Sequence, residues 1–220
     1  MTDDAPLTFA GTLDRGSLTA ATALLVDLVA DPAVAARWDQ ESACAGMSVG
    51  ALAAHLTVQP RRVVELLPTG PTHLEPISLE QHYDAVPWLQ QGLDGPANVG
   101  VVERSQEEAD AGPASVVAAA RDVQARLDEA LTLRPTAVLL PWQGTALATD
   151  DFLVTRLMEI VVHSDDLAAS VDLPTPRFTA STLDPVLALL TRLALLRHGQ
   201  DAVVRALSRP QRAPGTITAF

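Results

Sequence analysis

The sequence is poor in several residue types, and each shortage excludes a class of protein. Its 220 residues include one cysteine, Cys44, so no internal disulfide can form and we expect a reducing compartment. The first thirty residues lack the charged, then apolar, then small-residue pattern of a secretory signal. We therefore expect a cytoplasmic protein whose stability does not depend on disulfides.

Positive charge and long apolar runs are also scarce. The formal net charge of −12 would repel both phosphate backbones and anionic lipids. No apolar run approaches the roughly 20 residues that cross a bilayer. We expect a small-molecule substrate as partner, and neither nucleic acid nor a membrane. All 15 basic residues are arginine, which excludes Schiff-base and P-loop lysine chemistry and is typical of a GC-rich genome.

Apolar aliphatic residues are abundant. Hydrophobic residues make up 48% of the chain and aromatic residues only 4%, and most of the apolar residues are Ala, Leu and Val. Helix bundles are built from this mixture. A chain of this length can form one domain that buries about 70% of the surface its unfolded form exposes. We predict a single all-α domain over residues 1–220.

Apolar residues recur at helical spacing in four long segments, residues 9–30, 48–67, 113–133 and 150–170. Ser48 is suited to cap the second segment, and Pro60 should kink it. We predict a four-helix bundle over residues 9–172, with a C-terminal helical extension over residues 182–208.

The connections between these segments are less regular. Residues 72–102 contain many prolines and glycines and predict a long connection with one short helix near residues 79–86. Residues 138–147 are apolar around Pro141 and Gly144, and the pattern fits an extended loop or a short strand equally well.

A polar seam lies on the last bundle helix. Arg156, Glu159, His163 and Asp166 are spaced three, four and three residues apart, so they fall in one stripe of an otherwise apolar helix. The apolar neighbours leave this helix little solvent-facing surface, and buried ionised groups need partners. The seam therefore indicates a site or a buried ion-pair network.

Glu159 and His163 project side by side and could hold one ion. His55 lies on the apolar face of the second segment and is the obvious third ligand. Two histidines and one glutamate leave a coordination position for water or substrate, as in catalytic zinc sites. The alternatives are an internally paired Glu159 and His163, and a His55 that is merely a hydrogen-bonded core residue.

The flanking residues of the seam have two interpretations each. Asp166 could orient a ligand imidazole from behind, and Arg156 could bind a substrate carboxylate bidentately. As purely structural residues, both would pair with neighbours on other helices.

Two motifs resemble the mycothiol-dependent maleylpyruvate isomerase N-terminal domain family, which belongs to the DinB-like metal-binding four-helix bundles. The first is Trp-x-x-x-Ser-x-Cys-x-Gly ahead of a helix bearing Ala-x-His-Leu, and it spans residues 38–56. The second is Glu-x-x-x-His-x-x-Asp-Leu and spans residues 159–167. Met47 stands where this family usually has tryptophan. The resemblance covers roughly residues 9–172.

The resemblance implies a DinB-like fold in which His55, Glu159 and His163 bind a divalent metal, usually zinc. It also implies that the open position receives the thiolate of mycothiol, a thiol of actinobacteria, which fits a lysine-free chain. The leading hypothesis is a metal-dependent, mycothiol-using transferase or isomerase acting on a small electrophile.

Two other functions remain open. The same ion could activate water in a hydrolase. The protein could instead be a non-catalytic helical protein that binds a ligand or forms a homodimer through its bundle.

Other polar and aromatic residues are weaker candidates. Cys44 is interpreted as a packing or loop residue ahead of the second helix. His73, His82 and His198 are interpreted as surface residues. Tyr83 and Trp142 could line a substrate cleft or could simply be buried aromatics.

Overall fold

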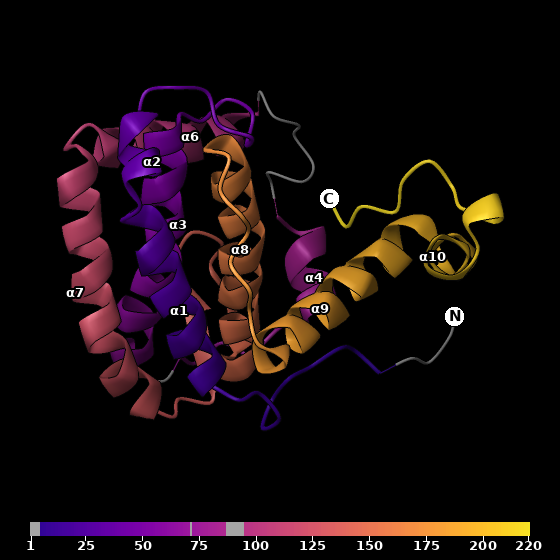
Figure 1. The fold of residues 1–220 in the computed structure, drawn as a ribbon. Helices are drawn as coiled ribbons and strands as arrows, with labels where there is room; N and C mark the ends of the chain where they lie inside the picture. The colour runs from indigo at the N-terminus through magenta and orange to yellow at the C-terminus, as the bar shows by residue number, and fades with distance from the viewer. Residues whose placement is uncertain (1–4, 71, 87–94) are drawn as a thin grey trace.

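The computed structural model describes residues 5–70, 72–86 and 95–220, and these residues form a mainly helical fold (Figure 1). The helices are α1 (Gly16–Val29), α2 (Pro32–Ala36), α3 (Val49–Leu66), α4 (Leu79–Asp84), α6 (Pro96–Ala109), α7 (Pro113–Thr132), α8 (Thr149–Ser170), α9 (Ala180–His198) and α10 (Gln200–Ser208). Short 3-10 turns cover Leu67–Thr69 and Pro210–Arg212, and the strands are β1 (Ala137–Leu140) and β2 (Thr145–Ala148).

Helices α1, α3, α7 and α8 form the bundle, which confirms the all-α, DinB-like fold class predicted from the sequence (Figure 1). Each of α1 and α3 packs against both α7 and α8. Leu25, Leu56, Leu127 and Leu157, one from each of the four helices, are fully buried in the core between them. The bundle is therefore held by burial of the apolar stripes that predicted it.

The predicted boundaries are right at α3, α7 and α8 but wrong at α1. The Ser48 side chain accepts a hydrogen bond from the Ala51 N–H and begins α3 as expected, and α3 continues through Pro60 without interruption. Helix α1 begins at Gly16 instead of Phe9. Asp151 and Asp150 of α8 accept hydrogen bonds from the backbone N–H groups of Phe9 and Gly11. These bonds hold the segment against the start of α8, so it does not form the first turns of α1.

Helix α6 was missed by the sequence analysis, which placed a loop over most of residues 72–102. Within that range the structure has α4 at Leu79–Asp84 and then the start of α6, which runs over Pro96–Ala109; residues 87–94 lie outside the described residues. Gly95 and Pro96 suggested a turn, but proline also fits the first position of a helix. Because α6 buries only Ser105 and Ala109 fully, its apolar periodicity is weak.

Residues 138–147, which the sequence left undecided, form most of an antiparallel hairpin. Strands β1 and β2 pair with Val138 opposite Leu147. Gly144 in the turn has a φ of 66°, a left-handed conformation that glycine adopts without strain. The hairpin turn carries Trp142 and Gln143 beside the bundle.

The C-terminal helices α9 and α10 extend from the bundle. Helix α9 packs on α8 at one end and then runs away from the bundle to α10 (Figure 1). It begins at Ala180, two residues before the predicted start of the extension at residue 182, and Gly199 ends it with a φ of 79°. No helix in the described ranges is long and apolar enough to cross a membrane.

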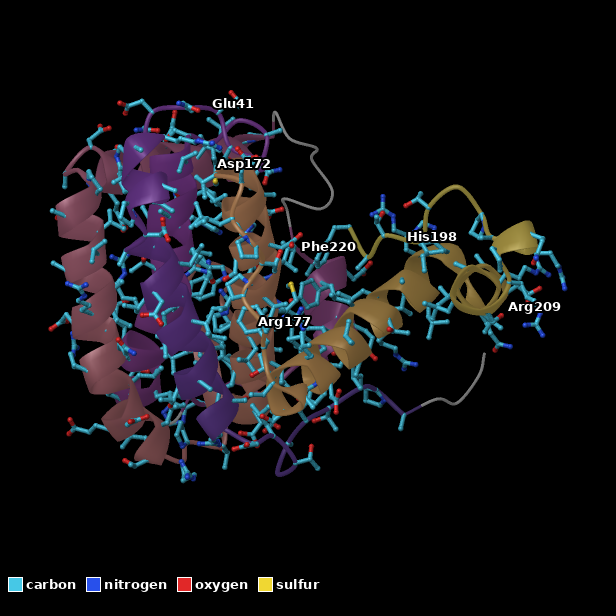
Figure 2. All side chains as sticks on the ribbon, in the orientation of Figure 1. Glu41, Asp172, Arg177, His198, Arg209 and Phe220 are labelled. Carbon is cyan, nitrogen blue, oxygen red and sulfur yellow. The ribbon has the colours of Figure 1, made fainter. Side chains whose placement is uncertain are left out.

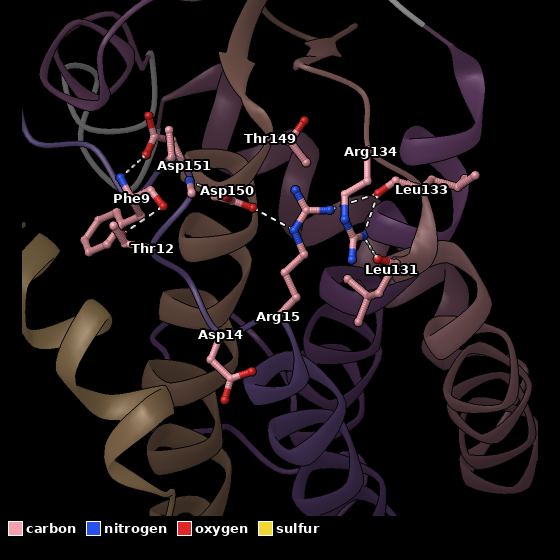
Figure 3. A network of polar contacts seen from close by, with 12 residues as sticks. Phe9, Thr12, Asp14, Arg15, Leu131, Leu133, Arg134, Thr149, Asp150 and Asp151 are labelled. Atoms are coloured by element: carbon pink, nitrogen blue, oxygen red, sulfur yellow. Dashed lines mark hydrogen bonds and ion pairs between the residues drawn. The ribbon is translucent and has the colours of Figure 1, made fainter.

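A polar network fixes the N-terminal end of α8 (Figure 3). Asp150 accepts hydrogen bonds from Arg15 Nε at 2.7 Å and from the Gly11 N–H at 2.8 Å. Asp151 accepts the Phe9 N–H at 2.6 Å and the Thr8 hydroxyl at 3.0 Å. Both carboxylates also lie at the positive end of the helix dipole. The network therefore holds the helix that carries the seam in a fixed position.

We expect Asp150→Ala to lower the free energy of unfolding by about 3 kcal/mol, because it leaves a largely buried Arg15 without its partner. The side chains of this pair are 17% and 9% exposed. The matched control is Asp122→Ala, which removes an ion pair on α7 whose side chains are 57% and 65% exposed. That control should cost less than about 0.5 kcal/mol. Urea denaturation of both variants checks the prediction, and equal losses would contradict it.

Candidate metal centre

Helices α3 and α8 bring three predicted ligands together. Glu159 Oε2 lies 3.3 Å from His163 Nε2 and 3.7 Å from His55 Nε2. One donor atom from each residue lies within 4.8 Å of the other two. The two imidazole rings meet edge to face with centroids 5.0 Å apart. This convergence needs the tertiary fold, because His55 is on a different helix from the other two residues.

Glu159 carries a negative charge in this cluster. Burial alone would raise the pKa of its carboxyl, but hydrogen bonds to His163 and His55 outweigh burial and hold that pKa well below its usual range. The Arg156 guanidinium acts in the same direction. The protein therefore presents an anionic oxygen between two imidazoles.

The two histidines differ in protonation. Burial would lower the pKa of His163, but hydrogen bonds and charges from Asp166 and Glu159 raise it to about 9. For His55, burial outweighs the attraction of Glu159 and, with repulsion from His163, lowers the pKa. In the metal-free protein at neutral pH, His163 therefore holds a proton that His55 does not.

Asp166 lies behind His163. Its Oδ2 is 3.0 Å from His163 Nδ1, the ring nitrogen that faces away from Glu159. A carboxylate in this position keeps a proton on Nδ1 and leaves the lone pair of Nε2 for a ligand. This contact matches the orienting role considered for Asp166 in the sequence analysis.

Arg156 lies in the core rather than facing an open space. It is 5% exposed, and its guanidinium donates to Gln59 Oε1 at 2.6 Å and to Thr155 Oγ1 at 3.1 Å. Because a guanidinium only donates, the amide oxygen of Gln59 must face Arg156. Gln59 then directs its amide nitrogen to His55, at 3.3 Å from Nε2 and 3.1 Å from the carbonyl oxygen.

Gln59 is the residue of the site that the sequence analysis missed. The Gln59 amide can donate to Nε2 only when the His55 proton is on Nδ1, so Gln59 favours the tautomer with a lone pair on Nε2. A lone pair on Nε2 is what a metal ligand needs. The available signal was the spacing of Gln59 four residues after His55 on the same face of α3.

Cys44 belongs to a second group of possible ligands, with His163 and Asp166. Burial raises the pKa of its thiol, and the charges of Asp166 and Glu159 raise it further. A protonated thiol is a poor ligand and a poor nucleophile. The group of His55, Glu159 and His163 is therefore the better candidate.

A groove of about 660 Å³ lies on the neighbouring face of α8, beyond Asp166. Val161, Val162 and Asp166 of α8 line it on one side. On the other side it is bounded by the segment before α9, which carries Arg177 (Figure 2). Asp166 thus lines the groove and also contacts His163.

The surface interpretation of His82 is wrong. His82 is 5% exposed, because α4 packs it beside Tyr83, which is also buried, with ring centroids 4.9 Å apart. Phe220 covers Tyr83 at a centroid distance of 5.9 Å, next to α4 (Figure 2). His73 is exposed as expected, while His198 is partly buried and contacts the Thr218 carbonyl oxygen.

The donor set fits a divalent metal ion. Two imidazole nitrogens and one ionised carboxylate oxygen are a combination that zinc takes at catalytic sites. The side chains of His55, Glu159 and His163 are 13%, 16% and 19% exposed, so the cluster is largely buried but not closed off completely.

Comparison with known protein families identifies a match for this chain. A family model described as the mycothiol maleylpyruvate isomerase N-terminal domain matches residues 18–168. That range contains α3 and most of α8, including all three clustered residues, whereas α9 and α10 lie outside it. No curated protein and no solved structure matches.

Zinc binding at pH 7 should release about one proton per ion, because His163 must lose its proton to bind while His55 has none to lose. The proton count comes from calorimetric titrations in two buffers with different ionisation enthalpies. Release should fall toward zero above pH 9, where His163 is already neutral. A release that does not depend on pH would contradict the assignment.

Gln59→Leu should weaken zinc binding by about 10- to 100-fold, because nothing then holds the His55 lone pair in place. Imidazole ¹⁵N shifts in the metal-free protein should show His55 losing its single tautomer. Gln124→Leu on α7 is the matched control and should change neither quantity. Normal zinc affinity in Gln59→Leu would show that the amide does not position His55.

Proposed function

Because the chain belongs to the mycothiol maleylpyruvate isomerase N-terminal domain family, we propose that it is a metal-dependent enzyme that uses mycothiol to act on a small electrophile. The observation that supports this most directly is the convergence of His55, Glu159 and His163. We also propose a cytoplasmic location, since thiol chemistry requires a reducing compartment.

In this proposal His55 Nε2, Glu159 Oε2 and His163 Nε2 hold the ion, and zinc is the metal that suits them. The chemistry that such an ion supplies is a lowered thiol pKa, which keeps the thiol of mycothiol nucleophilic at neutral pH.

The remaining residues of the seam prepare this site. Asp166 holds the proton of His163 on Nδ1, and Gln59, itself held by Arg156, favours the proton of His55 on Nδ1 as well. Both Nε2 lone pairs are then directed to one point beside the Glu159 carboxylate. Cys44 stays a neutral thiol because of its raised pKa, so it does not compete with the thiol of mycothiol.

Two reactions follow from attack of a thiolate on an electrophilic carbon. If the new carbon–sulfur bond persists and the product takes up a proton, the thiol is transferred. If that bond breaks after rotation about the former double bond, a cis substrate is isomerised and the thiolate is regenerated. The family name favours the second reaction, whereas transfer also needs a proton from solvent for the product.

The first test is metal content. Protein purified without chelators or nickel resin should carry about one divalent ion per chain. His163→Ala should lose the ion while its far-ultraviolet circular dichroism stays helical, and His73→Ala, at an exposed histidine, should keep it. Absence of metal, together with unchanged stability on zinc addition, would refute the proposal.

The second test asks whether the ion takes a thiol. Mycothiol added to the cobalt-substituted protein should produce a thiolate-to-cobalt absorption band. A cobalt protein that shows no such band would instead favour a hydrolase that activates water at the same ligands.

A further inference from the structure

Arg62 continues the site along α3. It lies seven residues after His55, two helical turns or about 10 Å along the same face. Its guanidinium lies over the Trp142 ring, 4.2 Å from the ring centroid. Stacking through its flat face leaves the N–H donors at its edge available.

The charge of Arg62 is not matched by a neighbouring carboxylate. Among residues 5–70, 72–86 and 95–220, no acidic side chain lies within ion-pair distance of it. The adjacent Arg61, by contrast, pairs with Glu108 at 2.6 Å and with Glu65 at 3.9 Å. Partial burial, together with repulsion from Arg156 and other arginines, lowers the pKa of Arg62 to about 10. The protein therefore holds a partly buried cation that needs an anion.

Buried polar atoms without an ordinary hydrogen bond lie in the hairpin turn that carries Trp142 and on α4. Gln143 follows Trp142 in the hairpin turn, and both ends of its amide are buried without a hydrogen-bond partner. His82 Nδ1 is also buried without a hydrogen bond of ordinary geometry, and the Gln143 amide is a polar group that acts on it. Each such atom costs about 1–3 kcal/mol unless a ligand or water satisfies it.

These groups surround the same part of α8. Burial, with repulsion from Arg156, lowers the pKa of His82 to about 4, while Gln143 and Glu159 act in the opposite direction. His82 and Arg62 thus lie within electrostatic range of the same two α8 residues, Arg156 and Glu159. Two guanidinium groups face one carboxylate here, although the whole chain carries a net charge of −12.

We propose that Arg62, His82 and Gln143 form a subsite for a carboxylate of the substrate, next to the candidate metal centre. A carboxylate accepts the edge N–H groups of Arg62 and an N–H of the Gln143 amide. This subsite deepens the proposed function and depends on it for the reaction at the other end of the substrate. It assigns the anion to Arg62 and not to Arg156, whose donors are directed to Gln59 and Thr155.

The test uses succinate as a dicarboxylate probe and succinamide as its uncharged counterpart. Calorimetric titration of the full chain should detect succinate and not succinamide. Arg62→Met should weaken succinate binding at least tenfold, both with zinc and without it. Arg126→Met, which removes an exposed arginine of α7, is the matched control and should leave binding unchanged.

Gln143→Leu gives a second measurement that does not rely on charge. It should weaken succinate binding while keeping or raising the melting temperature of the free protein, because it removes two unpaired buried atoms. If Gln143 had only a structural role, its substitution would lower the melting temperature and leave succinate binding unchanged.

The outcomes separate this proposal from the proposed function. Equal succinate affinity in the wild-type protein and Arg62→Met, or equal binding of succinamide, would overturn the subsite. A loss confined to the zinc-loaded form would place the carboxylate on the metal and would also overturn it. The tenfold loss in a chain that binds no zinc would support the subsite while the proposed enzyme chemistry fails.

Discussion

The charge of Glu159 is the constraint on which the rest of the site depends. A carboxylate packed between two helices of a bundle would ordinarily become neutral, because removal of its charge from water is costly. Here two imidazoles hold it ionised. His163 lies four residues after Glu159 on the same helix, whereas His55 comes from α3, so the ionised state of Glu159 depends on the packing of α3 against α8.

Each imidazole is oriented by a further polar side chain. Asp166 contacts His163 from one side, and the chain from Arg156 through Gln59 reaches His55 from the other. The seam of α8 therefore has its functional centre at Glu159 and His163, while its two ends act on the two histidines. This explains why four polar residues share a stripe on a helix that is otherwise apolar. It also explains the burial of Arg156, which acts through Gln59.

The sequence predicts those parts of the fold and of the candidate site that depend on the spacing of residues along one helix. The bundle helices have strong apolar periodicity, and Glu159, His163 and Asp166 share one helix, so their proximity follows from helical geometry. His55 required the family resemblance or a guess at which helices are adjacent. Gln59 could not be ranked above other glutamines without knowing that Arg156 fixes its amide.

The failures have equally physical causes. Helix α6 buries too few residues to show a pattern, and α1 begins late because Asp150 and Asp151 capture the chain before it. His82 was interpreted as a surface residue because it lies in a segment punctuated by prolines. Its burial depends on contact between α4 and residues far away in the sequence, including Phe220 packed on the adjacent Tyr83.

Helix α8 is fixed at its N-terminal end and carries the proposed metal ligands Glu159 and His163 in its middle. Its N-terminal residues are fixed to the 8–15 segment by charged hydrogen bonds, so its rotation about its own axis is fixed before the seam begins. A rotation of one residue would turn Glu159 by about 100° and separate it from His55. Asp150 and Asp151 therefore contribute to the geometry of the site, although both residues are about two helical turns or more from Glu159 along α8. Function and stability are coupled through the orientation of this one helix.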